Sequence, residues 1–181
     1  REKNNRYSRI FQNGPVALRT RNIGIISKEN AEKDATGPIA RASGMKFDYR
    51  EPHSTYQKLD FSTIYREEGD VLARVVQRFD EVNQSIDIIK RVIDRIEPGP
   101  IREYTEMEAG EAEHRMEAPR GELTYYIRTN EEGNIEDATI RTPSIMNVQA
   151  CVDHMMGGAP TIADAVAIYE SVDPCIACLE R

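Results

Sequence analysis

Two cysteines near the end of the chain, Cys175 and Cys178, have the spacing that most directly predicts chemistry. Two thiolates in a C-x-x-C pair can converge on one soft metal ion. The pair alone is also consistent with half of a zinc site, a redox dithiol or a chance pair. Because the chain stops three residues after Cys178, we expect that it was trimmed after the metal was inserted.

Composition limits the class of protein. The 181 residues are enough for one ordinary domain or for part of a larger one. A net charge of −7 argues against nucleic acid as the main partner. No apolar run reaches the roughly 20 residues that span a bilayer, and no signal-peptide pattern opens the chain. Three cysteines, two of them clustered, do not form a disulfide framework, which favours a reducing cytoplasm.

The elements that must position the cysteine pair are mainly helical. The strongest is a helix over residues 69–96, where apolar residues recur at helical spacing. We interpret its charged residues, among them Arg74, Arg78 and Glu81, as a solvated face. Pro98 ends this helix.

The remaining elements are shorter. Ser27 is expected to cap a short helix that Gly37-Pro38 ends, and residues 51–68 and 102–117 are expected to be loops. After them we expect a β-hairpin over 123–141, a helix from Ser144 to about Met156, and a last helix over 161–171, with Thr161 and Asp164 in a capping box.

Other residues of chemical interest favour structural roles. The three histidines, His53, His114 and His154, have no metal-ligand spacing and are expected on the surface or in helix packing. Cys151 lies mid-helix, where a small core residue is expected, and Met155 and Met156 are expected to pack.

Three segments have an order that is specific when they are taken together. They are Glu117-Ala118-Pro119-Arg120-Gly121-Glu122; Arg141-Thr142-Pro143-Ser144 with Asn147; and Asp173-Pro174-Cys175-x-x-Cys178-x-x-Arg181. This order resembles the C-terminal half of the large subunits of NiFe hydrogenases. Arg181 at the last position resembles the membrane-bound, energy-converting class.

An earlier segment widens the resemblance. Gly37-Pro38-x-x-Arg41-Ala42-Ser43-Gly44-x-x-x-Asp48-x-Arg50, followed by Leu59-Asp60-Phe61, is similar both to that class and to the quinone-site subunit of respiratory complex I. The cysteines favour the hydrogenase, because the complex I subunit lacks the C-x-x-C pair. The resemblance extends over nearly the whole chain from Gly24 onward.

The resemblance implies a fold. It would be mainly α with a small β-hairpin, the helical-core fold shared by NiFe hydrogenase large subunits and the complex I subunit. Residues 1–181 would form one domain, the C-terminal portion of that fold. The helix over 69–96 would lie in the core, the hairpin over 123–141 at its edge, and the metal-ligand terminus at 173–181.

The resemblance also implies a site. Cys175 would be a terminal nickel ligand and a proton-accepting base, and Cys178 would bridge nickel to an iron that carries carbon monoxide and cyanide. Arg120, restrained by Pro119, would lie over the metal pair. Pro119, Thr142, Pro143 and Ser144 would form the cofactor-binding surroundings of the iron ligands.

Each assignment has a structural alternative. The cysteines would otherwise be a zinc half-site, Arg120 a salt-bridge residue and Ser144 a helix N-cap. Asp173 would either pair with Arg120 or Arg181, or form a turn before Pro174.

A charged cluster is implied away from the cysteines. By the resemblance, Arg41, Asp48 and Arg50 would form a hydrogen-bonded group that supports proton movement or coupling to neighbouring subunits. A purely structural ion pair is the alternative.

The implied function is reversible reduction of protons to hydrogen by a membrane-bound NiFe hydrogenase. The implied partners are the N-terminal half of the large subunit, an iron–sulfur small subunit, membrane ion-translocating subunits and ferredoxin, with no nucleic acid. The chain would be peripheral, on the cytoplasmic side of the membrane, with no transmembrane segment.

One departure from the family pattern concerns the metal ligands. The family holds nickel with two C-x-x-C pairs, and the first pair is absent from these 181 residues. A companion chain, a longer polypeptide or a degenerate site would each account for this. Two other functions therefore stay open: a complex-I-like coupling subunit without hydrogenase activity, and a zinc-stabilised scaffold.

Overall fold

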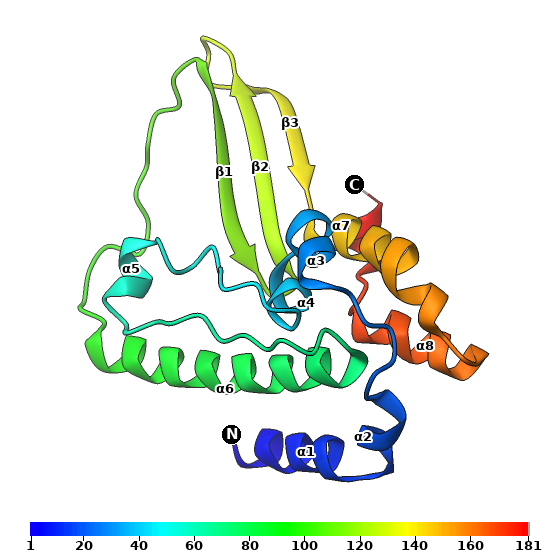
Figure 1. Cartoon of the computed structure of the whole chain (residues 1–181). Helices are drawn as coiled ribbons and strands as arrows, with labels where there is room; N and C mark the ends of the chain where they lie inside the picture. The colour runs from blue at the N-terminus through cyan, green and yellow to red at the C-terminus, as the bar shows by residue number, and fades with distance from the viewer. Residues whose placement is uncertain (181) are drawn as a thin grey trace.

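The computed structural model describes residues 1–180. A long helix, α6, lies across the molecule between an N-terminal helix pair on one side and a three-stranded antiparallel sheet on the other (Figure 1). The helices are α1 (Glu2–Asn13), α2 (Pro15–Thr20) and α6 (Val71–Arg95), and the strands are β1 (Gly110–Ala118), β2 (Gly121–Thr129) and β3 (Ile135–Arg141).

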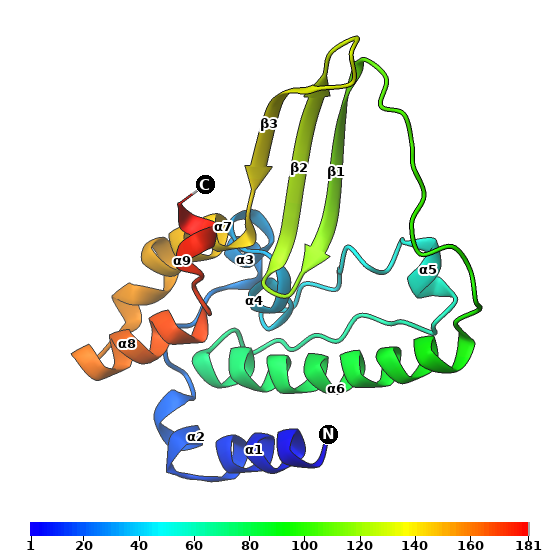
Figure 2. The same cartoon turned by 180° about the vertical axis from the view of Figure 1, so that it is seen from behind.

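Short helices surround the foot of the sheet. Before α6 come α3 (Lys28–Asp34), α4 (Gly37–Arg41) and α5 (Ser54–Gln57). After the sheet come α7 (Pro143–Ala150), a π-helical turn (Cys151–Met155), a 3₁₀ turn (Met156–Gly158), α8 (Ile162–Ser171) and α9 (Ile176–Leu179). Figure 2 shows α9 beside α7, close to the end of β3.

The prediction of a long central helix is confirmed. Asp70 caps α6 by accepting a hydrogen bond from the backbone N–H of Ala73, at 2.7 Å. The first turns of α6 are buried, with Leu72 and Val76 packed against Ala17 of α2. The prediction that its charges form a solvated face is wrong for Arg74, which is fully buried.

The pair α1 and α2 was not predicted. Of α1, only Ser8 is buried, and its few apolar side chains, Tyr7, Ile10 and Phe11, do not form a long repeating pattern in the sequence. It lies along α6 through a tilted contact between the rings of Phe11 and Phe79, whose centroids are 5.7 Å apart.

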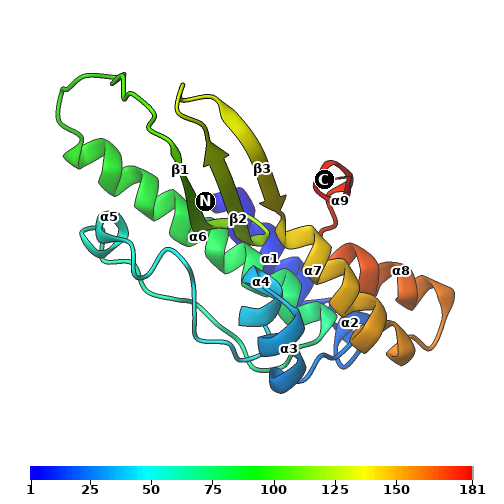
Figure 3. The same ribbon diagram turned by 90° about the horizontal axis from the view of Figure 1, so that it is seen from above.

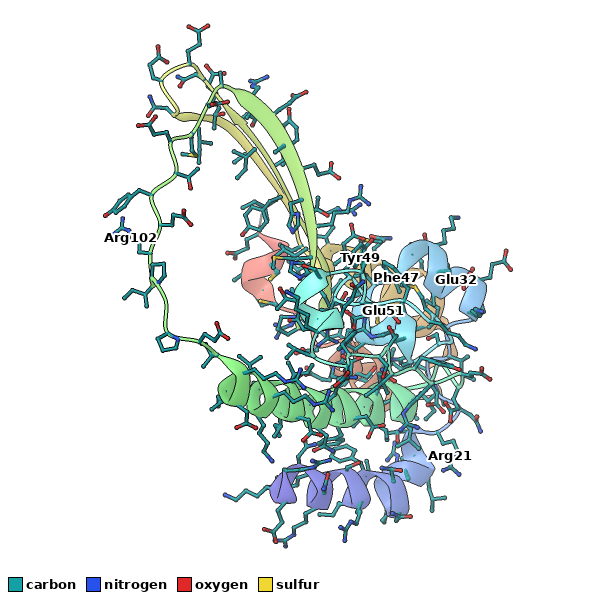
Figure 4. The ribbon with its side chains drawn as sticks, turned by 90° about the vertical axis from the view of Figure 1, so that its left-hand side faces the viewer. Arg21, Glu32, Phe47, Tyr49, Glu51 and Arg102 are labelled. Carbon is teal, nitrogen blue, oxygen red and sulfur yellow. The ribbon has the colours of Figure 1, made fainter. Side chains whose placement is uncertain are left out.

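The sheet has one strand more than the predicted hairpin. The hairpin of β2 and β3 is confirmed, but residues 110–117, expected as loop, form most of β1 and pair with β2 from Gly110↔Thr129 to Ala118↔Gly121. Seven of the nine β1 residues are exposed, so the strand lacks the alternation that predicts strands from sequence. Figure 4 shows Phe47 and Tyr49 near the foot of the sheet, whose far end rises away from the helices.

The main core lies where segments from both halves of the chain meet. Side chains from α3, α4, α6, α7, the π-helical turn and α8 form it: Ala31, Ile39, Val71, Ala150, Cys151, Met155, Ile168 and Val172. Core positions for Cys151 and Met155 are therefore confirmed, and Met156 packs against the same cluster.

Several predicted boundaries are corrected. The Ser27 cap is confirmed, but α3 ends at Asp34, and Gly37-Pro38 begins α4, because proline is favoured in the first turn of a helix. The segment 51–68 contains α5. Thr142, not Ser144, is the N-cap residue of α7, and α8 is followed by α9.

Candidate functional site

The two cysteines lie together on the short helix α9. Cys175 is its N-cap residue, and the backbone N–H of Cys178 donates to the Cys175 carbonyl at 3.0 Å. Both side chains are partly exposed. The hydrogen bond from the Cys178 thiol lowers the pKa of Cys175, and the same bond raises the pKa of Cys178. Of the two thiols, Cys175 therefore loses its proton more easily than Cys178.

The start of α7 holds the backbone of this pair. The Thr142 hydroxyl donates to the Cys178 carbonyl at 2.6 Å, and the Ser144 hydroxyl accepts from the Cys175 N–H at 3.3 Å. Both hydroxyls belong to buried residues. Pro143, between the two residues, occupies the first turn of α7 and has a fixed φ angle. The turn that carries both hydroxyls is therefore rigid.

Arg120 is tied to the residue that leads into the cysteines. Its Nε donates to the Asp173 carbonyl at 2.8 Å, and its Nη2 pairs with the Asp173 carboxylate at 3.1 Å. The predicted pairing of Asp173 with Arg120 is therefore confirmed; its alternative partner, Arg181, lies outside the described residues. Asp173 has a positive φ angle of 57°, which turns the chain into Pro174.

Glycines explain why Arg120 lies at this place. Pro119 and Arg120 form the two-residue turn between β1 and β2, and the turn crosses the start of α4. A Cβ atom on Gly37 would come within 2.4 Å of the Gly121 Cα, so neither backbone tolerates a side chain there. The Asn147 amide links this turn to the start of α4: it donates to the Arg120 carbonyl at 3.0 Å and accepts from the Thr36 N–H at 2.9 Å.

Thr36 and Asn147 are the positioning residues that sequence reasoning missed. The Thr36 hydroxyl accepts from the Glu122 N–H at 2.9 Å, which fixes the β2 side of the same turn. Both residues are almost fully buried. Asn147 belongs to one of the segments that carry the resemblance, whereas nothing in the local sequence marks Thr36.

A second group of charged residues lies between α4, α6 and β1. Arg41 and Asp48 are each 1% exposed and approach to 3.2 Å, and Asp48 also pairs with Arg50. The predicted cluster of these three residues is confirmed. It also contains Glu81 and Glu117, each 2.8 Å from the Arg41 guanidinium.

Glu81 and Glu117 were missed for different reasons. Glu81 lies in α6 among charges predicted to be solvated, but its carboxylate points to Arg41 and to Gln77. Glu117 opens the segment that carries Arg120, yet it was placed in a loop. The five residues form a mixed network of three carboxylates and two guanidinium groups.

The network shifts the ionisation of its members. Burial disfavours the Asp48 carboxylate, but hydrogen bonds from Arg50 and the charge of Arg41 outweigh burial and lower the Asp48 pKa. For Glu117 burial wins over the attraction of Arg41, and its pKa is raised. The two carboxyl groups therefore differ in acidity although both contact Arg41.

The two thiols are the candidate metal ligands of the described chain. Across residues 1–180, no group of three or more His, Cys, Asp and Glu side chains has the arrangement to hold a metal ion. His53 and His114 are exposed, and His154 contacts Asp34 at 2.8 Å. The thiol pair suits a soft metal as half of a four-thiolate site.

The described residues include no helix long and apolar enough to cross a membrane.

Comparison with known proteins identifies several similar chains. The family model described as the 49 kDa subunit of respiratory-chain NADH dehydrogenase matches residues 1–106 and 101–181. A carbon monoxide-induced hydrogenase of Rhodospirillum rubrum is 39% identical over 95% of this chain and 49% of its own length. A subunit of the NADH-quinone oxidoreductase of Rhizobium etli is 35% identical over 97% of this chain and 51% of its own length.

A solved structure shows the same fold. The membrane-bound sulfane sulfur reductase, an archaeal respiratory membrane complex, contains a chain that superimposes with a TM-score of 0.90 and 29% identity, over 99% of this chain and 52% of that one. The present chain thus spans about half the length of the relatives that it matches.

Proposed function

This chain belongs to the family of the 49 kDa subunit of respiratory-chain NADH dehydrogenase, and on that premise we propose that it forms half of the catalytic subunit of a membrane-bound NiFe hydrogenase. The observation that carries the proposal is the joint placement of Cys175, Cys178, Arg120 and Thr142–Ser144 at one corner of the fold. Its similarity to a carbon monoxide-induced hydrogenase supports it.

The residues present fit half of such a centre. Cys175 and Cys178 would hold the metal pair, and two further thiolates would come from the other half of the family fold. The centre, with carbon monoxide and cyanide on its iron, would supply reversible interconversion of protons and hydrogen.

The chain's own residues then have distinct tasks. The Cys175 Sγ would hold and release a proton. The Arg120 guanidinium, fixed through Asp173, would keep a positive charge beside the thiols. Thr142 and Ser144 bond the cysteine backbone, so they would position the ligands, and Pro119 and Pro143 would stiffen the two turns that surround them.

The partners follow from the same proposal. The relatives are subunits of membrane-bound respiratory complexes, so we place this chain in a complex with ion-translocating membrane subunits. Electrons would pass through an iron–sulfur small subunit to ferredoxin, and the chain would be peripheral on the cytoplasmic face.

Infrared spectroscopy and metal analysis on one sample of the intact complex test the proposal. We expect carbon monoxide and cyanide bands together with nickel and iron in equal amounts. Zinc in place of nickel, with no such bands, would contradict it and favour a zinc-stabilised scaffold.

A second function, a complex-I-like coupling subunit without hydrogenase activity, is favoured by the buried charged network. This network consists of Arg41, Asp48, Arg50, Glu81 and Glu117. Similarity to the NADH-quinone oxidoreductase of Rhizobium etli supports it as well. In that case the intact complex would contain neither nickel nor zinc at the thiols, and an Asp48→Asn variant would impair electron transfer coupled to ion movement.

A further inference from the structure

Two arginines of α6 bind the end of α8. Arg74 and Arg78 are four residues apart, so they project from neighbouring turns of one helix face. Figure 3 shows α8 ending beside the first turns of α6, with α9 after it. The Arg74 Nε donates to the Ser171 Oγ at 2.9 Å, and Arg78 donates to the carbonyls of Ser171 at 2.7 Å and Val172 at 3.2 Å. We call this pair of residues the arginine clamp.

The contacts of the clamp are made where a helix most needs donors. Ser171 is the last residue of α8, and Val172 is its C-cap residue. Carbonyls at this end of a helix have no partner within the helix and carry a partial negative charge. A guanidinium group supplies several N–H donors and a positive charge, so it satisfies both needs. The clamp therefore fixes the end of α8 by directed bonds in addition to apolar packing.

The clamp is itself fixed in α6. The Arg74 Nη1 donates to the Gly69 carbonyl at 2.8 Å, and the Arg78 Nη1 also donates to the Arg74 carbonyl at 3.2 Å. Arg74 is fully buried, and burial lowers its pKa to about 10. Burial also lowers the pKa of Arg78, an effect that the charges of Asp173 and Glu81 partly offset. Both arginines thus stay charged at neutral pH although water hardly reaches them.

A short and firmly held segment joins the clamp to the thiols. Only four residues separate Ser171 from Cys175. Between them, Asp173 is held by Arg120 through its carbonyl and its carboxylate, and Pro174 has a fixed φ angle. A displacement of the end of α8 is therefore carried into the position of Cys175.

We propose that Arg74 and Arg78 are positioning residues of the thiol site, which act by holding the end of α8 and through it the segment 172–180. Among the described residues, neither forms a hydrogen bond with Cys175 or Cys178. Their effect on chemistry comes from distance alone, since a reacting group misplaced by about 1 Å costs about 100-fold in rate. The part of the inference that concerns hydrogen turnover rests on the proposed function; the part that concerns the position of the segment does not.

Amide hydrogen exchange of the intact complex, read peptide by peptide, tests the position. Arg78→Gln removes both carbonyl contacts of the guanidinium. Arg91→Gln is the matched control, because Arg91 is also an arginine of α6 that donates to a backbone carbonyl, that of Leu59, on the far side from the thiols. We expect exchange over residues 172–180 to be roughly tenfold or more faster in Arg78→Gln and unchanged in Arg91→Gln. Unchanged exchange in Arg78→Gln, or equal acceleration along the whole chain, would overturn the proposal.

A milder variant tests Arg74. Ser171→Ala removes the hydroxyl that accepts from the Arg74 Nε and leaves both arginines in place. We expect a smaller acceleration of exchange, confined to the same peptide. If exchange over residues 172–180 stayed at the parental rate, the assignment of Arg74 to the clamp would be wrong.

Infrared spectroscopy and kinetics separate positioning of the thiols from general stability. In Arg78→Gln we expect the carbon monoxide and cyanide bands to shift and kcat per nickel to fall about tenfold or more, with an unchanged KM for hydrogen. Parental bands together with a parental kcat would overturn the positioning role. A complex without these bands would contradict the proposed hydrogenase activity, and hydrogen exchange would still decide whether the clamp holds the segment.

Discussion

Arg120 holds Asp173 by two atoms at once: its Nε bonds the Asp173 carbonyl at 2.8 Å, and its Nη2 bonds the carboxylate at 3.1 Å. The backbone of β2 is thereby joined to the segment that places Cys175. Asn147 of α7 donates a hydrogen bond to the Arg120 carbonyl, so Arg120 is also connected to α7. The arginine is therefore a link between three parts of the chain as well as a charge beside the thiols.

Replacing Arg120 by lysine separates these contributions. Arg120→Lys keeps a positive charge but loses the planar two-point contact with Asp173. We expect metal content to stay unchanged and hydrogen turnover in the intact complex to fall by about 10²–10³, the usual loss for a positioned charged donor. Arg128→Lys, on the exposed part of β2, is the matched control. An unchanged rate in Arg120→Lys would remove Arg120 from the mechanism.

Replacing Cys178 tests the thiol pair itself. Cys178→Ser retains the size of the side chain but removes the soft ligand, so we expect loss of nickel and of hydrogen turnover. Cys151→Ala is the control, because Cys151 is fully buried in the core on the π-helical turn. Hydrogen turnover and metal content are measured together, and turnover retained by Cys178→Ser would contradict the assignment.

The buried network predicts a pH dependence of stability. The Asp48 pKa is lowered from its ordinary value of 3.8, so the unfolded chain binds the proton more readily than the native protein. The stabilisation is therefore present above about pH 4 and is lost as the pH falls through the lower native pKa. Glu117, with a raised pKa, acts in the opposite direction, because its contribution is lost as the pH rises.

Asp48→Asn tests this assignment. The variant leaves Arg41 and Arg50 short of a carboxylate, and we expect the free energy of unfolding to fall by about 3–5 kcal/mol at neutral pH. We also expect the stability of the variant to decrease less steeply as the pH is lowered. Melting temperatures of the intact complex across the acid range measure both effects. If the stability of the variant decreased at acid pH as steeply as that of the parent protein, Asp48 would not be the titrating group.

The close crossing of two glycines predicts a sharp steric effect. In Gly121→Ala the new Cβ would lie 2.7 Å from the Thr36 Cγ2 and 2.8 Å from the Gly37 nitrogen, on a backbone with φ of 128°. We expect a loss of about 1–3 kcal/mol and displacement of Arg120. Gly99→Ala is the control, since nothing lies within 4 Å of its Cβ position. The melting temperatures of both variants are compared. Equal melting temperatures would contradict the close contact between the backbones of Gly37 and Gly121.

Local patterns were sufficient where the cause of structure is local. The apolar period of α6, the Ser27 cap and the β2–β3 hairpin each depend on neighbours in the sequence, and each is confirmed. The same patterns missed α1 and β1, because these elements are mostly exposed and owe their conformation to pairing with α6 and β2.

The sequence by itself determined which residues are available for chemistry: a C-x-x-C pair, an arginine between proline and glycine, and a T-P-S turn. Only the tertiary structure decided how they act together. It showed that Thr142 and Ser144 bond the backbone of the cysteines, and that Thr36 and Asn147 hold the Arg120 turn. It also turned Glu81 from a predicted surface charge into a partner of Arg41. Such contacts join residues far apart in the chain, so their energies depend on the packing of α4, α6 and β1 and not on any local spacing.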